Sequence, residues 1–239
     1  MLACPAPNVH YKYRAILPHV TIFPVVPLTP AQRDLLLNLA RAGLLERLAS
    51  AGGSAPERDG PQDRVSEVAA ATAGAHKADD DHTPTSDAEL TTPAGCFVSL
   101  HEKVTHRLRG CVGRLDPEMP LWRVVRETAG DVLRDPRFTD TPVTVDDLPI
   151  LELEISVLSP PHLAAGPLDF DPLTDGIYLV HGKRTGFFLP QVARETRWSK
   201  QQLLNRLCDE KLGLPCDAWQ KPEAKLFTFK VEVIGPEAL

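Results

Sequence analysis

Near the middle of the chain the sequence reads Leu108-Arg109-Gly110-Cys111-Val112-Gly113, a short stretch with unusual chemistry. If the stretch is extended, successive side chains point to opposite faces, so Arg107, Arg109 and Cys111 share one face. Positive charge nearby favours the thiolate form of a cysteine. The glycines on either side remove side chains, as is typical where another backbone or a ligand comes close. These residues predict a cysteine that is nucleophilic, binds a metal or binds another ligand.

The same residues also fit a purely structural interpretation. Free cysteines are often buried and inert, and the neighbouring arginines would then be paired with carboxylates. His101 and His106 precede Cys111 with the spacing H-x4-H-x4-C. Zinc accepts these donors, but the spacing suits no common ligand knuckle, so we expect no metal here. The sequence alone leaves the reactive and the structural interpretation open.

The residues before this stretch indicate a hairpin. Cys96–Leu100 is mostly apolar, and the polar segment His101–His106 separates it from Arg107–Val112. Two apolar runs joined by a short polar segment are typical of antiparallel strands. We therefore expect Cys111 to lie on the second strand of a β-hairpin.

A second motif, Asp135-Pro136-Arg137-Phe138, follows a predicted helix. Proline ends helices because it lacks the amide donor and clashes with the preceding turn. Asp135, beside Arg137, could form an ion pair with Arg109 or Arg114. The motif is thus either a rigid exit from the helix or part of a binding site that includes Asp135 and Arg137.

The rest of the chain alternates between helical and strand patterns without a regular strand–helix–strand rhythm, which predicts an α+β fold with antiparallel pairing. Capping residues and apolar spacing predict helices that begin at Thr29-Pro30, Pro120 and Ser199. Alternating or short apolar runs predict strands over Leu151–Val157, Ile177–Val180, Phe187–Leu189 and Phe227–Val233. The segment His181–Gly186 is expected to be the turn of a second hairpin.

Two parts of the chain stand apart from this pattern. Residues 1–28 are rich in proline and aromatic residues and form an N-terminal extension, either a folded-on arm or a loose tail. Residues 51–88 contain few large apolar side chains, so burial cannot offset the entropy lost on ordering. We expect a flexible insertion there, with at most one helical turn at 65–71, inside a single domain that spans residues 29–239.

Composition restricts the class of partner. The chain of 239 residues has 26 basic and 32 acidic side chains, a net charge of −6, which disfavours a surface made for nucleic-acid phosphates. A local basic cluster has no aromatic stacking platform and is expected to be a solvated face; it comprises Lys183, Arg184, Arg194, Arg197 and Lys200. No apolar run is long enough for a membrane span. The scattered cysteines form no CxxC pair, and a cytoplasmic protein is predicted.

Several motifs together resemble one protein family. The segments Gly95–Leu100, Leu108–Gly113 and Asp135–Phe138 occur in the order that is typical of the AMMECR family, which includes protein A of the AmmeMemoRadiSam system. Later segments also match, namely Leu151–Leu158, Asp175–Ile177, Phe188–Ala193 and Trp198. The likeness covers about residues 29–48 and 89–236. Departures from the family pattern are Val112 in place of the commoner isoleucine and Cys96 in place of a small residue.

The resemblance implies two intimately packed α+β subdomains with mostly antiparallel sheets and a cleft near Leu108–Gly113. It implies site residues Leu108, Arg109, Gly110, Cys111 and Gly113. From the arginine-flanked thiol we expect Cys111 and Arg109 to be the catalytic residues among them. It implies a modification pathway with a Memo-like protein and a radical S-adenosylmethionine enzyme as partners, but no cofactor that the sequence specifies. The alternative is a non-catalytic module that binds a protein or RNA partner and has a regulatory role.

Overall fold

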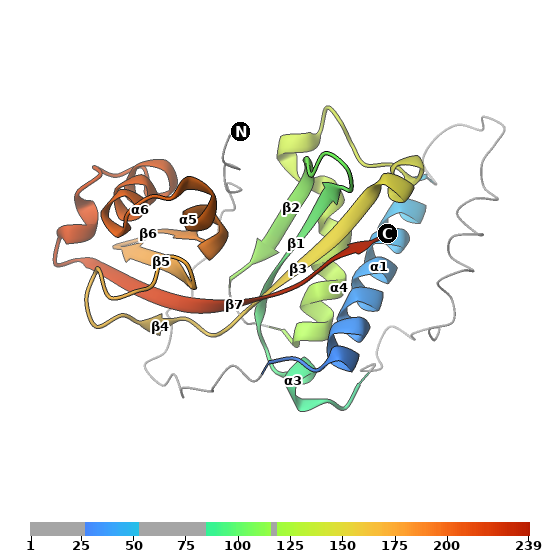
Figure 1. Ribbon diagram of the computed structural model, residues 1–239, viewed down its shortest axis with the longest axis horizontal. Coiled ribbons are helices and arrows are strands. Elements are labelled where there is room, and N and C mark those ends of the chain that lie inside the picture. The colour runs from blue at the N-terminus through green and yellow to red at the C-terminus, as the bar shows by residue number, and fades with distance from the viewer. Residues whose placement is uncertain (1–26, 53–84, 116–118) are drawn as a thin grey trace. The chain divides into compact units, whose positions relative to one another are not determined.

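The computed structural model describes residues 27–52, 85–115 and 119–239. Two predictions fall mostly outside the described residues. These are the N-terminal extension and the insertion, of which residues 53–84, with the helical turn expected at 65–71, are not described. The described chain divides into two compact units (Figure 1). The first unit comprises residues 27–157 and 233–239, and the second unit comprises residues 158–232.

The elements that the sequence predicts occur in the expected order, with two short helices and one short strand, α3, α5 and β4, that were not predicted. The helices are α1 (Pro30–Gly52), α3 (Ala88–Thr91), α4 (Leu121–Asp131), α5 (Pro190–Thr196) and α6 (Lys200–Arg206), which continues as a π-helical turn over Leu207–Leu212. The strands are β1 (Gly95–Glu102), β2 (Leu108–Arg114), β3 (Leu151–Leu158), β4 (His162–Leu163), β5 (Asp175–His181), β6 (Arg184–Phe188) and β7 (Ala224–Ala238). Short 3-10 turns cover Val132–Arg134, Pro136–Phe138, Val145–Ile150 and Ala218–Gln220.

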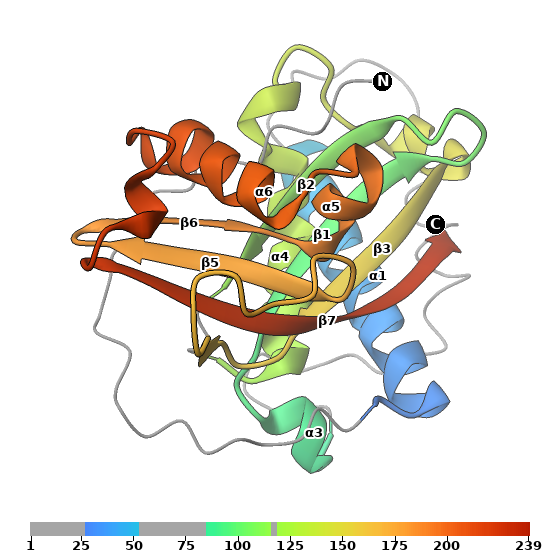
Figure 2. The same ribbon diagram turned by 60° about the vertical axis from the view of Figure 1, so that its left-hand side comes forward.

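In the first unit, α1 and α4 pack side by side against one face of a sheet (Figures 1 and 2). The strand order is β2-β1-β3, and the last residues of β7 lie next to β3. The apolar face of α1 enters this core, with Leu36 and Leu44 fully buried. The two helices cross closely at Gly43, where an added Cβ would lie 2.0 Å from the carbonyl oxygen of Arg126.

The β1–β2 hairpin has the predicted antiparallel pairing. Val98 faces Val112, Ser99 faces Cys111 and Leu100 faces Gly110, but the next pair is His101 with Leu108. Arg109 is therefore the extra residue of a β-bulge. A bulge interrupts the alternation of side chains along a strand and re-aims the residues beside it.

The second unit places helices on one face of a smaller antiparallel sheet (Figure 2). Its strand order is β7-β5-β6, and β4 pairs with β7. A capping box begins α6 at the predicted Ser199, because the Ser199 hydroxyl accepts from the Gln202 amide at 3.3 Å and the Gln202 side chain accepts from the Ser199 amide at 2.9 Å. The C-cap residue Gly213 is in the left-handed region, at φ +61°.

The structure confirms the α+β class with antiparallel pairing, and it corrects one turn. The sequence analysis assigned all of His181–Gly186 to the turn between two strands, whereas β5 and β6 pair as far as His181 with Arg184. Only Gly182 and Lys183 remain as the turn. The polar side chains of this hairpin end are solvated, so they carry no apolar alternation that would have revealed the strands.

Candidate functional site

The backbone of Cys111 is hydrogen-bonded to two side chains that form an ion pair with each other. Its backbone N–H donates to Asp135 Oδ2 at 2.9 Å, and its carbonyl accepts from Arg137 Nη2 at 3.0 Å. Asp135 and Arg137 in turn form a two-pronged pair, with Nη2–Oδ2 at 2.6 Å and Nε–Oδ1 at 3.0 Å. The Asp135–Arg137 pair thus satisfies the polar groups of Cys111 as a neighbouring strand would, at the edge strand of the sheet.

The local sequence explains how this pair is placed. Pro136 starts the 3-10 turn that follows α4, and the Asp135 carboxylate caps this turn by accepting from the Arg137 amide at 3.1 Å. Asp135 has a side chain that is only 1% exposed, against 19% for Arg137. Burial alone would raise the pKa of Asp135, but hydrogen bonds from Arg137 and from the Cys111 amide outweigh burial and lower it.

The lowered pKa of Asp135 predicts a loss of stability in acid. A carboxylate whose pKa is lower in the folded state stabilises the fold above its unfolded pKa of about 3.9, and this contribution is lost as the pH falls through the folded value. The free energy of unfolding, measured with urea, should therefore decrease as the pH is lowered below about 4. In Asp135→Asn this fall should be smaller, and equal pH slopes in the two proteins would contradict the assignment.

The two glycines of the motif are required by packing within the first unit. A Cβ on Gly110 would lie 2.8 Å from the Val132 carbonyl oxygen, directly after α4. A Cβ on Gly113 would lie 2.3 Å from the Phe97 ring and 2.4 Å from the Cys96 carbonyl oxygen. Leu108 is half-buried and pairs with His101 beyond the bulge. The space that the glycines free is therefore occupied by the chain itself.

Arg109 pairs with the carboxylates of Glu102 and Asp147 and not with Asp135. Its guanidinium contacts Glu102 at 3.3 Å and Asp147 at 3.5 Å, and its side chain is 9% exposed. Its Nε atom is buried and has no partner within the described part of the chain. Hydrogen bonds from Arg107 and Thr105 lower the pKa of Glu102 to about 2, so Glu102 is ionised at neutral pH.

Two expectations about the arginines need correction. Asp135 pairs with Arg137 itself and not with Arg109 or Arg114; Arg114 instead contacts Glu127 at 3.8 Å and Asp131 at 3.7 Å. The strict alternation that placed Arg109 and Cys111 on one face is interrupted, because Arg109 itself is the bulge residue. The guanidinium that directly contacts the Cys111 backbone belongs to Arg137.

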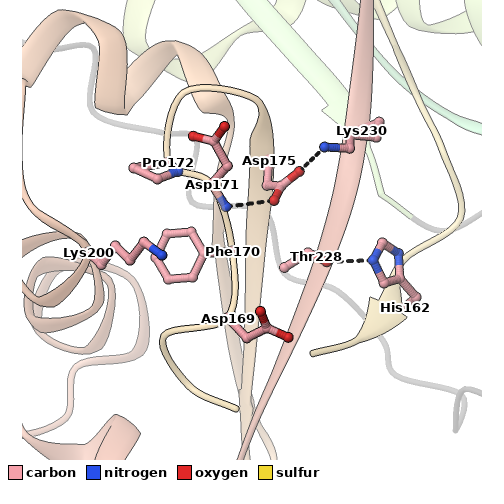
Figure 3. A pocket seen from close by; sticks show the side chains of 9 residues that line it. All are labelled: His162, Asp169, Phe170, Asp171, Pro172, Asp175, Lys200, Thr228 and Lys230. Atoms are coloured by element: carbon pink, nitrogen blue, oxygen red, sulfur yellow. Dashed lines mark hydrogen bonds and ion pairs between the residues drawn. The ribbon is translucent and has the colours of Figure 1, made fainter. Parts of the chain in front are cut away.

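A separate pocket lies in the second unit and was not anticipated from the sequence (Figure 3). Its volume is about 490 Å³. Its lining comes from β4, β5, α6, β7 and the loop before β5, and consists of His162, Asp169, Phe170, Asp171, Pro172, Asp175, Lys200, Thr228 and Lys230. These residues are scattered over about 70 positions, and only Asp175 belongs to a segment that matches the family pattern.

The comparison with protein families gives a clear match. The family model described as AMMECR1 matches residues 65–234, which is more than half of the chain. The chain belongs to the AMMECR1 family. This AMMECR1-family chain is 35% identical to Protein MJ0810 of Methanocaldococcus jannaschii over 58% of its own length and 71% of that protein. It is also 35% identical to Protein TK0174 of Thermococcus kodakarensis, over 65% and 77% of the two chains.

A solved structure supports the fold of this AMMECR1-family member. The crystal structure of uncharacterized protein PH0010 from Pyrococcus horikoshii superimposes with a TM-score of 0.62 at 28% identity. The match covers 87% of this chain and 96% of that chain. The resemblance stated from the motifs is thus confirmed at the level of family and fold.

The other described cysteines of the AMMECR1-family chain differ from Cys111 in their surroundings. Cys96 is fully buried, and this burial raises the pKa of its thiol to about 12. Cys208 is also buried, and its pKa is raised by the same cause. Cys216 is exposed, whereas Cys111 is half-buried. Cys111 therefore combines a fixed backbone with a thiol that is not sealed in the core.

The histidines near Cys111 do not gather around it. His106 lies in the turn with φ +54° and contacts Glu152 at 3.5 Å. Burial lowers the pKa of His101. Within residues 27–52, 85–115 and 119–239, no three histidine, cysteine or acidic side chains form a group that could hold a metal ion.

Three members of the basic cluster predicted from the sequence donate hydrogen bonds to backbone carbonyls. Arg184 donates to the carbonyls of Leu212 and Gly213, at 2.9 and 2.5 Å. Arg194 and Lys200 likewise donate to backbone carbonyls of the second unit, at 2.9 and 3.0 Å.

In the described ranges no helix has both the length and the apolar character that a membrane span needs.

Proposed function

We propose that this AMMECR1-family protein is a cytoplasmic enzyme or enzyme accessory in which Cys111 is the reactive or ligand-holding group. One observation carries the proposal: the Asp135–Arg137 pair grips both backbone polar groups of Cys111 at 2.9 and 3.0 Å, while the thiol stays half-buried. A buried ion pair is costly to desolvate, so its use to fix one residue favours a residue whose position matters.

The roles of the surrounding residues follow from their contacts. Asp135 and Arg137 act as positioning residues, because they hold the backbone of Cys111 as an ion pair whose charges compensate each other. Gly110 and Gly113 let β2 approach Val132 and Phe97 closely. Arg109 supports the bulged end of the strand through Glu102 and Asp147, and its unpartnered Nε–H is a donor for an anionic group of the ligand.

We further infer a place in a modification pathway that includes a Memo-like protein and a radical S-adenosylmethionine enzyme. Membership of the family supports this inference. A pull-down with these two proteins from the same source tests it. Association that survives high salt and is lost when Cys111, Asp135 and Arg137 are replaced together would support it, and no association with either protein would refute it.

The reactivity of Cys111 tests the main proposal. At pH 7, iodoacetamide should modify Cys111 about tenfold faster than the exposed Cys216, as expected of a nucleophilic cysteine compared with an ordinary exposed thiol. Peptide mass spectrometry of the native protein gives both rates in one sample. Cys96 should stay unmodified until the protein unfolds, since burial raises its thiol pKa to about 12.

The matched variant is Arg137→Gln, which removes the charge but keeps hydrogen-bond donors. It should slow the alkylation of Cys111 and leave the alkylation of Cys216 unchanged. If Cys111 reacts no faster than Cys216 in the wild type, and Cys111→Ser leaves every cellular readout intact, the reactive-cysteine proposal fails. The non-catalytic binding module would then be the better description.

A further inference from the structure

The sheet of the first unit carries polar side chains on the face that is turned away from α1 and α4 (Figures 1 and 2). Leu100 of β1 lies in the core against the two helices, so its neighbours Ser99 and His101 point to the opposite face. Ser99 is directly opposite Cys111 on β2, and side chains of such a pair lie on the same face. The thiol of Cys111 therefore shares this polar face with Ser99 and His101.

Strand β3 adds a carboxylate next to His101. It runs antiparallel to β1, because the Lys103 amide just after β1 donates to the Ile150 carbonyl just before β3, at 2.9 Å. Pairing continued along the two strands from this bond places Glu152 beside His101. The electrostatics agree: burial lowers the pKa of His101, and the charge of Glu152 opposes this shift. His106, in the hairpin turn, also contacts Glu152, at 3.5 Å.

His101 thus lies between a thiol and a carboxylate. On one side Glu152 is its direct neighbour on β3. On the other side Cys111 is its diagonal neighbour on β2, one pair along from Ser99. Diagonal neighbours in an antiparallel sheet are about 7–8 Å apart, which a ring side chain can span. A thiol, an imidazole and a carboxylate in this order match a nucleophile, its base and the group that orients the base.

The β-bulge determines which groups face His101. Regular pairing would set Arg109 opposite His101, but the bulge sets Leu108 there, and the Arg109 guanidinium pairs with two other carboxylates. The titratable groups that face His101 from the turn, β2 and β3 are His106, Cys111, Glu152 and Glu154. Burial outweighs the carboxylate charge, so the imidazole is neutral at pH 7 and can accept a proton.

The next row of the sheet carries polar groups that the protein does not satisfy. The same register places Glu154 beside Ser99, on the side away from Cys111. Both side chains are half-buried, and neither forms a hydrogen bond or ion pair within residues 27–52, 85–115 and 119–239. Burial, followed by the charge of Glu152, raises the pKa of Glu154. Half-buried polar groups beside a thiol, without partners of their own, are typical of a site that meets a substrate.

We propose that Cys111, His101 and Glu152 form a catalytic triad across β2, β1 and β3, an inference that rests on the proposed role of Cys111 as the reactive group. His101 is a catalytic residue that takes the proton of the thiol. The S–H bond breaks, an N–H bond forms on the imidazole, and the electron pair stays on sulfur. Glu152 is a positioning residue, whose charge stabilises the imidazolium. The substrate supplies the hydrogen-bond partners that Ser99 and Glu154 lack.

The pH dependence of Cys111 alkylation by iodoacetamide tests the triad. At pH 7 an ordinary thiol, with a pKa of about 8.5, is only about 3% ionised. His101→Asn should therefore slow the reaction of Cys111 about tenfold at pH 7, to the rate of the exposed Cys216. At pH 9.5 the thiol ionises unaided, so the wild type and His101→Asn should react at rates within twofold. His101→Gln, which fills more of the space, should give the same profile.

Replacement of the carboxylate tests the role of Glu152. Glu152→Gln removes a charge that raises the pKa of His101, so the acid fall in the Cys111 alkylation rate should move to lower pH. His181→Asn is the matched control, because it replaces a half-buried histidine at the end of β5 in the second unit, and it should leave the profile unchanged. Cys96 should stay unmodified in every variant, which shows that the first unit is folded.

The outcomes separate a wrong triad from a wrong function. If Cys111 reacts tenfold faster than Cys216 and His101→Asn reacts just as fast, the reactive cysteine stands and the triad is wrong. Equal slowing of His101→Asn at pH 7 and pH 9.5 would show a structural role, and equal slowing by His106→Asn would refute the choice of His101. If Cys111 of the wild type reacts no faster than Cys216 at pH 7, the proposed function fails and the triad fails with it.

Discussion

Replacement of Asp135 by alanine is expected to destabilise the protein by about 3 kcal/mol, since it breaks a buried ion pair from one side. The carboxylate is 1% exposed and accepts from both Arg137 and the Cys111 amide. Its loss leaves a guanidinium that is 19% exposed and a backbone N–H without their acceptor. Urea denaturation at pH 7 measures the effect.

Two further variants distinguish the loss of the Asp135–Arg137 ion pair from a general loss of packing. Asp135→Ala combined with Arg137→Met removes both charges and should cost less than Asp135→Ala alone. Asp140→Ala changes an exposed aspartate five residues further along and should stay within about 0.5 kcal/mol of the wild type. A double variant as unstable as the sum of its single variants would show that the pair is not coupled.

Gly43→Ala is the second change for which we expect a large effect, a net destabilisation of about 2 kcal/mol. The added Cβ would lie 2.0 Å from the Arg126 carbonyl oxygen, and backbone atoms of α4 can yield only if the two helices separate. Overpacking of this kind costs about 1–3 kcal/mol or more, which exceeds the gain of roughly 1 kcal/mol from replacing a helical glycine with alanine.

Thermal unfolding followed by circular dichroism measures this effect. Gly166→Ala is the matched control, because an added Cβ at Gly166 has no atom within 4 Å and the residue does not have a positive φ. It should be neutral or slightly stabilising. If Gly43→Ala is as stable as Gly166→Ala, the close approach of α1 to α4 does not exist in solution.

The parts of the fold that depend on local chemistry were predictable from the sequence. The Thr29 cap forms as expected, with the Gln32 amide donating to its hydroxyl at 3.3 Å. Ser199 and Gly213 likewise act as the cap residues that their types and positions indicate. Helix caps and strand alternation extend over a few residues, so one sequence is enough to recognise them.

The candidate site was predictable only as separate motifs. Cys111 and Asp135 were both named from the sequence, but their hydrogen bond joins a side chain to a backbone amide 24 residues away. Such a bond leaves no trace in the residue types. The structural interpretation expected the arginines to be paired with carboxylates, as Arg109 is, but it did not identify Glu102 and Asp147 as the partners. A bulge cannot be predicted from alternation, and Asp147 lies 38 residues away.

The shared use of β7 has a consequence for the synthesis of this protein. Residues 233–239 complete the first unit, where Ile234 is 3% exposed in the core and the Leu239 amide donates to the Leu151 carbonyl at 3.2 Å. These residues follow all of residues 158–232 in the chain, so they are synthesised after the second unit. The first unit therefore cannot complete its core until the whole second unit has been made.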